Sequence, residues 1–277
     1  MLRIEDLDTP RVVPGAADDI LRTLEAFGFE WDGEVVYQSQ RVCAYQDALE
    51  KLRRQGLVYP CGCSRREILA SAPHPGEEGP IYPGICRDGL PPGRMARSMR
   101  LRVPAAPLAF SDGVYGPVEQ RLADEVGDFV LRRADGLFAY QLAVVVDDAA
   151  AGVTEVVRGA DLLSSTPRQI YLYHCLSLPV PRYFHLPLAL SNEGEKISKR
   201  HGGVSAVGSQ DSGSLLWDVL HFLGQQVPPS MRTAPPREVL AWGVSCFDPL
   251  RIDPASRLWE GGTTARNTAS GRSRNVA

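Results

Sequence analysis

Short apolar runs alternate with amphipathic helical patterns along most of this 277-residue chain. Strand-like runs lie at 2–5, 99–103, 128–132, 153–157 and 184–190, and helical patterns at 14–27, 39–56, 166–176 and 215–223. Residues 138–146 are apolar throughout, so their period does not separate helix from strand. Strands that alternate with helices predict an α/β fold with a parallel sheet, which segment 61–125 interrupts as an insertion.

Composition excludes several classes of protein. No apolar run approaches the roughly 20 residues that span a bilayer, and the opening MLRIEDLDTP lacks the apolar core of a signal peptide. We therefore expect a cytoplasmic protein without a membrane segment. A net charge of −3 excludes a surface that is basic throughout, but it allows a local basic patch for nucleic acid.

Three of the six cysteines lie close together in a segment with few apolar residues. Cys61 and Cys63 are one residue apart, and Tyr82 and Cys86 follow after a spacer of 18 residues. Thiolates are soft ligands that suit Zn²⁺, and a tetrahedral site needs four ligands, so Tyr82 or His74 would be the fourth. The alternative is that the cysteines are incidental. A metal is favoured because so polar a loop needs another source of stability.

A glycine-flanked basic loop follows the strand-like run at 184–190. It contains Lys196, Lys199 and Arg200 within the sequence GEKISKR. Cations on such a loop can close over a triphosphate and neutralise charge at the reacting phosphorus. The alternative is an ordinary solvated charge run.

Two further charged residues come at the ends of predicted strands. Arg158 lies where open α/β sheets bind their ligands, and an arginine there can hold a carboxylate in a bidentate manner. It could equally form a structural ion pair with Asp161 or Asp148. Glu5 ends the first strand, where it could hold an ammonium group, or belong to an acidic cluster stabilised by the following helix N-terminus.

Taken together and in this order, these pieces resemble a class I aminoacyl-tRNA synthetase of the glutamyl type. The resemblance runs over residues 2–205 and rests on LRIEDLDTPR, FAYQLAVVVDDAAAGVTEVVRGADLL and LPLALSNEGEKISKR, whose KISKR corresponds to the Lys-Met-Ser-Lys-Ser loop. Within that group the chain is most similar to the short paralogues that act on tRNA(Asp). Residues 201–277 hardly accommodate a full anticodon-binding domain, and the Cys-x-Cys…Tyr-x₃-Cys spacing matches the zinc site of these paralogues.

The resemblance implies a two-step reaction. Glutamate attacks the α-phosphate of Mg-ATP to give glutamyl-adenylate, and the glutamate then passes to queuosine in the anticodon loop of tRNA(Asp). It implies that Glu5, Tyr140 and Arg158 bind glutamate. It also implies that Lys199 contacts ATP and is catalytic together with Lys196, and that one structural zinc is held by four side chains, Cys61, Cys63, Tyr82 and Cys86.

The resemblance also predicts the domain organisation. We expect the first part of a Rossmann-like catalytic domain at 1–60, the zinc-bearing insertion at 61–125 and the second part with the KISKR loop at 126–205. A short helical segment at 206–260 and a disordered tail at 261–277 would follow. We expect a monomer. We predict a local basic patch for RNA backbone, with a solvated strand edge as the alternative. The patch would comprise Arg87, Arg94, Arg97, Arg100 and Arg102.

The family begins with a strand and helix that carry a His-Ile-Gly-His-type signature, and no such segment precedes Arg3 in this sequence. In the family, the segment with this signature would comprise roughly 30 to 40 residues, which is the span between successive strands of a βαβ unit. We therefore expect the chain as written to be a poor enzyme. Two other hypotheses remain open. One is a fragment of a glutamyl-tRNA synthetase that charges tRNA(Glu), and the other is a non-catalytic zinc-bearing RNA-binding remnant.

Overall fold

A computed structural model describes residues 1–71, 75–76, 79–197 and 212–259 of the chain. Two compact units are present. The first comprises Met1–Asp18 and Trp31–Leu186, and the second comprises Asp19–Glu30 and Pro187–Ala277. The predicted division at residues 60, 125 and 205 stays a prediction, and the predicted disordered tail at 261–277 lies outside the described residues.

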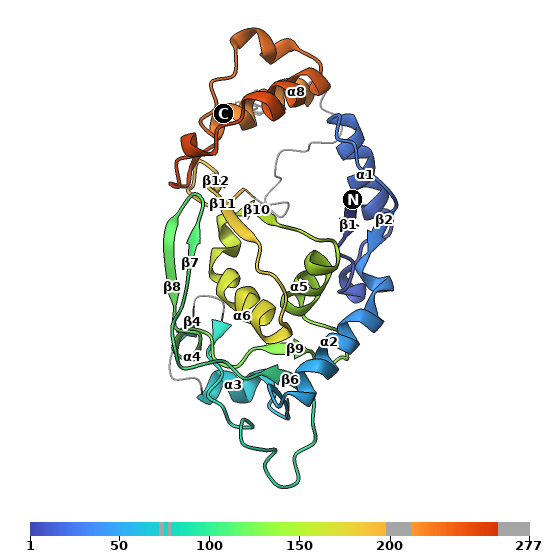
Figure 1. The fold of residues 1–277 in the computed structure, drawn as a ribbon, viewed down its shortest axis with the longest axis vertical. Coiled ribbons are helices and arrows are strands. Elements are labelled where there is room, and N and C mark those ends of the chain that lie inside the picture. Colours follow the sequence, from blue (N-terminus) through green and yellow to red (C-terminus); the bar gives the residue numbers. More distant parts are fainter. Residues whose placement is uncertain (72–74, 77–78, 198–211, 260–277) are drawn as a thin grey trace, which may run out of the picture. The chain divides into compact units, whose positions relative to one another are not determined.

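The α-helices vary in length from 4 residues in α4 to 13 residues in α2 (Figure 1). They are α1 (Ala16–Ala26), α2 (Val42–Arg54), α3 (Arg65–Ser71), α4 (Leu122–Glu125), α5 (Tyr140–Ala150), α6 (Thr166–Leu176), α7 (Ser212–Phe222) and α8 (Pro236–Cys246). The apolar run at 138–146, which the sequence left undecided, is thus helical. Short 3-10 helices stand at Thr9–Arg11, Gln38–Gln40, Ala160–Ser165, Pro229–Thr233 and Pro249–Arg251.

The strands form several small sheets rather than one. They are β1 (Leu2–Ile4), β2 (Val35–Tyr37), β3 (Val58–Cys61), β4 (Pro75–Gly76), β5 (Gly79–Pro80), β6 (Ser98–Leu101), β7 (Leu108–Asp112), β8 (Gly116–Gln120), β9 (Val130–Arg132), β10 (Glu155–Gly159), β11 (Arg182–Leu186), β12 (Ala189–Leu190) and β13 (Arg257–Leu258). Parallel pairs join β1 to β2, β10 to β11, β11 to β7 and β12 to β13. Antiparallel pairs join β3 to β6, β6 to β9 and β7 to β8.

This topology corrects three expectations. The parallel pairs of β1 with β2 and of β10 with β11 belong to separate sheets instead of one interrupted parallel sheet, and the segment between α2 and α5 adds antiparallel pairs. Strand β10 is at the edge of its sheet and Val157 is 61% exposed, so the prediction of a buried strand there was wrong. The run at 184–190 divides into β11 and β12 around Pro187, which has no N–H to donate to a ladder.

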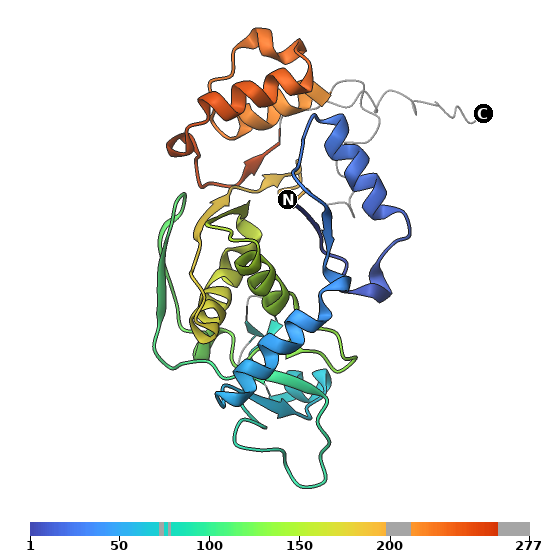
Figure 2. The same cartoon turned by 45° about the vertical axis from the view of Figure 1, so that its right-hand side comes forward.

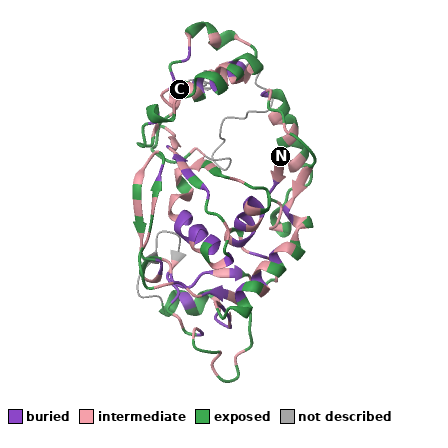
Figure 3. Ribbon diagram, viewed as in Figure 1, coloured by how far each residue is buried: buried purple, intermediate pink, exposed green. Residues whose placement is uncertain are grey.

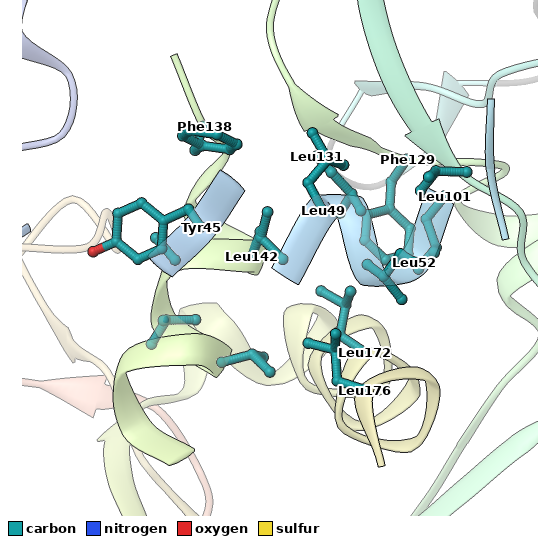
Figure 4. Close-up of a cluster of buried hydrophobic side chains, with 14 of the residues drawn as sticks. Tyr45, Leu49, Leu52, Leu101, Phe129, Leu131, Phe138, Leu142, Leu172 and Leu176 are labelled. Atoms are coloured by element: carbon teal, nitrogen blue, oxygen red, sulfur yellow. The ribbon is translucent and has the colours of Figure 1, made fainter. Parts of the chain in front are cut away.

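The apolar core of the first unit lies between α2, α5, α6 and the strands β6 and β9 (Figure 4). Helices α5 and α6 lie side by side (Figure 1), and α2 packs on both of them and on β3 (Figure 2). Buried residues concentrate on these helices in Figure 3. The largest fully buried apolar side chains include Tyr45, Leu52, Leu142, Leu172 and Tyr173. Each such side chain contributes about 1.5–3 kcal/mol through removal from water.

Helix α5 also buries two consecutive carboxylates. Asp147 accepts hydrogen bonds from Gln38 Nε2 at 2.9 Å, Arg41 Nε at 2.6 Å and Tyr45 Oη at 2.7 Å. A buried charge is tolerated only when it is paired and hydrogen-bonded, and three donors from one neighbouring segment meet that requirement. Asp147 therefore fixes the start of α2 against the last turn of α5.

In the second unit, α7 packs on α8 and on the 3-10 helix Pro229–Thr233. Gly213 on α7 approaches the Ala234 carbonyl so closely that an added Cβ would lie 2.1 Å from its oxygen. This contact explains why a glycine occupies a helical position there. Among the residues that the structure describes, no helix is long and apolar enough to cross a membrane.

The substitution Asp147→Ala should destabilise the chain by about 3–5 kcal/mol, because it leaves the Arg41 guanidinium and two buried donors without their acceptor. Urea denaturation measures the free energy of unfolding. The matched control is Asp19→Ala, which removes an exposed ion pair with Arg22 and should cost less than about 1 kcal/mol. An equal decrease in the free energy of unfolding for the two variants would contradict a structural role for Asp147.

Candidate functional site

The three side chains expected to bind glutamate lie in the first unit on separate elements. Glu5 directly follows β1, Tyr140 is the first residue of α5 and Arg158 is the fourth residue of β10. Burial raises the pKa of the Tyr140 hydroxyl, nearby Arg158 lowers it and Glu5 raises it again. The charges of Arg158 and Glu5 thus both influence the Tyr140 phenol, and the glutamate-binding role of the three residues stays a prediction.

Arg3 connects Glu5 to α5. Its Nη1 donates to Asp148 Oδ1 at 2.5 Å, and its Nη2 donates to Glu5 Oε1 at 3.0 Å. Burial lowers the pKa of the Arg3 guanidinium, but the bonds to Asp148 and Glu5 outweigh burial and hold it above its ordinary value. One oxygen of Glu5 is therefore held in place, while the side chain stays 43% exposed. Asp148 pairs with Arg3, and not with Arg158 as one sequence alternative supposed.

Arg158 is held by neutral groups. Its Nε donates to His185 Nε2 at 3.1 Å, and its Nη2 donates to Thr166 Oγ1 at 2.7 Å. The guanidinium carbon lies 5.3 Å from the centre of the Tyr183 ring. A planar guanidinium fixed at two nitrogens and against an aromatic face keeps a defined orientation, which is what bidentate recognition of a carboxylate requires.

A buried carboxylate lies behind His185. The imidazole is fully buried, and its Nδ1 is 2.6 Å from Asp112 Oδ2. Burial lowers the pKa of His185. Burial raises the pKa of Asp112, but hydrogen bonds from the Tyr115 backbone and His185 outweigh this and lower it. Neither residue has a role predicted from the sequence, although a histidine within a strand-like run is a signal that could have prompted one.

The predicted metal ligands also come together. The sulfur atoms of Cys61, Cys63 and Cys86 all lie within 4.8 Å of one another and are buried. The Tyr82 hydroxyl is 3.4 Å from Cys61 Sγ and 3.8 Å from Cys63 Sγ. Three converging thiols with a phenol at their edge are a donor set that fits a four-coordinate Zn²⁺ ion. The alternative fourth ligand, His74, lies outside the described residues.

Cationic side chains surround this cluster. Arg94 Nη1 donates to Cys63 Sγ at 3.3 Å, and the Arg100 guanidinium stacks 3.8 Å from the centre of the Tyr82 ring. Arg87 Nη1 pairs with Asp128 at 2.5 Å. The buried position of Arg100 contradicts its place in the predicted basic patch, whereas Arg87 is 38% exposed and its place there stays a prediction. Arg100 is only 7% exposed because its strand faces inward at that position.

A cavity of about 890 Å³ borders the sulfur cluster in the same unit. Its wall includes Tyr82, Arg100, Ser164 and Arg168. The volume falls within the range of small-molecule sites. Its lining carries both signs of charge, with arginines at 65, 100, 133 and 168 and carboxylates at 124, 125, 128 and 135. The lining therefore does not by itself select a ligand.

The basic loop belongs to the second unit. Lys196 forms an isolated antiparallel bridge with Leu190, and its side chain is exposed. Lys199 and Arg200 lie outside the described residues. The ATP contact of Lys199 and the catalytic role of Lys196 and Lys199 therefore stay predictions.

Comparison with known proteins identifies the group to which these motifs belong. A family model described as "tRNA synthetases class I (E and Q), catalytic domain" matches residues 1–225. A protein of Geobacter sulfurreducens named "Glutamyl-Q tRNA(Asp) synthetase" is 54% identical over 262 residues, which are 92% of this chain and 83% of that protein. A protein of the same name from Dechloromonas aromatica is 57% identical over 243 residues, covering 87% of this chain and 80% of the relative.

Two solved structures share the fold. One is a glutamate tRNA ligase from Elizabethkingia meningosepticum in complex with its amino acid, with a TM-score of 0.73 and 23% identity. The other is a glutamate-tRNA synthetase from Elizabethkingia anophelis, with a TM-score of 0.74 and 23% identity. Each similarity covers 94% of this chain, which spans 60% and 61% of the two solved chains. At this identity the similarity concerns the fold alone.

The buried His185 should make stability depend on pH in a predictable direction. Its pKa in the folded chain is below the ordinary value of 6.5, so the unfolded chain binds the proton more readily. The contribution of His185 to the free energy of unfolding is complete above pH 6.5 and is lost as pH falls toward the folded pKa. The free energy then changes by at most about 1.4 kcal/mol per pH unit. Urea denaturation between pH 5 and pH 8 should show a smaller slope for His185→Gln than for the unsubstituted chain.

The control for this measurement is His174→Gln on the exposed face of α6. This variant should retain the full slope. An unchanged slope in His185→Gln would contradict the assignment of a buried neutral imidazole.

Proposed function

Because the chain belongs to the class I tRNA synthetase family of the E and Q type, within the group of glutamyl-Q tRNA(Asp) synthetases, we propose that it attaches glutamate to queuosine in tRNA(Asp). The predicted resemblance is confirmed by the family model and by the curated relatives at 54% and 57% identity. The chain is therefore a ligase of the class I synthetase type. The observation that carries the proposal is the Arg158 guanidinium, which His185 and Thr166 hold in a defined orientation in the first unit.

The first step would activate glutamate. The Glu5 carboxylate accepts hydrogen bonds from the ammonium group of the amino acid, Arg158 binds one carboxylate, and the Tyr140 hydroxyl completes the contacts. The other carboxylate attacks the α-phosphorus of Mg-ATP, the bond to the bridging oxygen breaks and pyrophosphate leaves. Lys196 and Lys199 are assigned to neutralise the charge that develops on the phosphate oxygens.

The second step would transfer the activated glutamate. A nucleophilic group of the queuosine base attacks the carbonyl carbon of glutamyl-adenylate, and AMP leaves. The names of the relatives support tRNA(Asp) as the acceptor. We assign the reaction to the cytoplasm and to a monomer.

Incubation with labelled glutamate, ATP and purified tRNA tests this function. We expect label on tRNA(Asp) that contains queuosine, and none on tRNA(Asp) that lacks it or on tRNA(Glu). Label on tRNA(Glu) would support a glutamyl-tRNA synthetase instead. Binding of tRNA without glutamate-dependent exchange of pyrophosphate into ATP would support a non-catalytic RNA-binding protein.

The substitution Arg158→Lys should lower kcat/KM for glutamate by about tenfold to a hundredfold, because an ammonium cannot reproduce two fixed N–H donors. Pyrophosphate exchange at varied glutamate concentration measures this effect. The matched control is Arg182→Lys on the neighbouring strand, where the guanidinium is 75% exposed and pairs with Glu155. An equal effect of the two variants would contradict a glutamate-binding role for Arg158.

We also propose one structural zinc ion, held by Cys61, Cys63, Tyr82 and Cys86, which would cross-link a loop that has little apolar core of its own. Cys86→Ser should reduce the zinc content from about one ion per chain and lower the Tm, whereas the exposed Cys43→Ser should change neither. Atomic absorption and thermal unfolding measure these outcomes. A full complement of zinc in Cys86→Ser would contradict the site.

Chelator competition identifies the fourth ligand. If Tyr82 is the ligand, Tyr82→Phe should release zinc to a chromogenic chelator faster than the unsubstituted chain, and His74→Ala should not. The reverse order would assign the position to His74.

A further inference from the structure

The contacts of Arg158 determine the proton positions on His185. An arginine Nε–H can only donate, so His185 Nε2, at 3.1 Å from Arg158 Nε, must be the acceptor. The single proton of a neutral imidazole is then on Nδ1, which donates to Asp112 Oδ2 at 2.6 Å. The hydrogen bonds therefore run in one direction, from the guanidinium through the imidazole to the carboxylate.

Asp112 is firmly anchored. Its Oδ1 accepts backbone hydrogen bonds from Val114 and Tyr115, both at 3.0 Å, and from His185 at 3.2 Å. Asp112 ends β7, and the turn that follows begins with Gly113, where an added Cβ would lie 2.1 Å from the Phe184 ring. The β7–β8 hairpin thus places its one buried carboxylate directly behind the histidine of β11.

Thr166 completes the support. Its Oγ1 accepts from Arg158 Nη2 at 2.7 Å and lies 3.1 Å from His185 Nε2. The hydroxyl proton is available to the Leu162 carbonyl at 3.3 Å or to the imidazole. Two nitrogens of the guanidinium are consequently held by oriented acceptors from different elements, β11 and the first residue of α6.

We propose that His185 and Asp112 are positioning residues for substrate recognition, in which Asp112 fixes the tautomer of His185 and His185 fixes the plane of the Arg158 guanidinium toward the bound glutamate. The proposal rests on the glutamate-binding role of Arg158 given above. A neutral acceptor orients Arg158 without neutralising it, so its positive charge remains available to a carboxylate. An aspartate in direct contact would cancel part of that charge.

Nuclear magnetic resonance of histidine labelled with ¹⁵N tests the geometry without reference to activity. The chain has five histidines, and His185→Gln assigns the signal. We expect a protonated Nδ1 and an unprotonated Nε2 at neutral pH. Arg158→Lys should shift the Nε2 resonance, and the control Arg182→Lys should leave it unchanged. A protonated Nε2, or no response to Arg158→Lys, would overturn the proposal.

The proposal also predicts weaker binding of the glutamyl group when Arg158 loses its support. Calorimetry with glutamyl-sulfamoyl adenosine, a stable analogue of the adenylate, measures this binding. His185→Leu and Asp112→Asn should raise its Kd by about tenfold to a hundredfold, the value of a hydrogen bond to a charged group. His185→Gln can place an amide oxygen near the Nε2 position and should recover part of the affinity. The exposed His174→Gln should have no effect.

Sulfamoyl adenosine without the glutamyl group separates positioning from a general loss of structure. Its Kd should be the same in all variants. Equal weakening of both ligands, or an unchanged Kd of the glutamyl analogue in His185→Leu, would overturn the proposal. If the unsubstituted chain does not bind the glutamyl analogue, the proposed function fails. The NMR response to Arg158→Lys still decides in that case whether His185 holds Arg158.

Discussion

Two adjacent buried carboxylates on α5 hold the first unit together around its candidate site. Asp147 accepts three hydrogen bonds from residues 38–45, and Asp148 pairs with Arg3 on β1. Because an unpaired buried carboxylate costs several kcal/mol, α5 can pack in this way only when both partner segments are in place. The residues that meet here are more than 100 positions apart in the chain.

A similar arrangement supports two of the residues that are predicted to bind glutamate, Glu5 and Arg158. Glu5 is held by Arg3, which is held by Asp148, and Arg158 is held by His185, which is held by Asp112. In each case a buried carboxylate holds a side chain that in turn contacts a residue predicted to bind glutamate. Side chains that are oriented before the ligand arrives lose little conformational entropy on binding, so more of the interaction energy is available for recognition.

Much of this site could be predicted from the sequence because its components lie in short segments. The spacing of Cys61, Cys63 and Cys86 predicted their convergence, which the structure confirms. The family resemblance assigned Glu5, Tyr140 and Arg158 to glutamate, and that role stays a prediction. The residues behind them could not be found in this way. Asp112 and His185 are 73 positions apart, and only the pairing of β7 with β11 brings them into contact. Arg100 was misassigned to a surface because the inward face of a short strand cannot be identified from charge alone.

If the buried carboxylates orient the candidate site, they determine how well it binds glutamate. The most direct measurement is the Kd of glutamyl-sulfamoyl adenosine for Asp148→Asn, with the free energy of unfolding determined on the same samples. Asparagine keeps the shape of Asp148 but weakens its bond to Arg3, and charge-assisted hydrogen bonds are roughly twice as strong as neutral ones. We predict a Kd about threefold to tenfold higher in a chain that remains folded. An unchanged Kd in a folded variant would contradict this account.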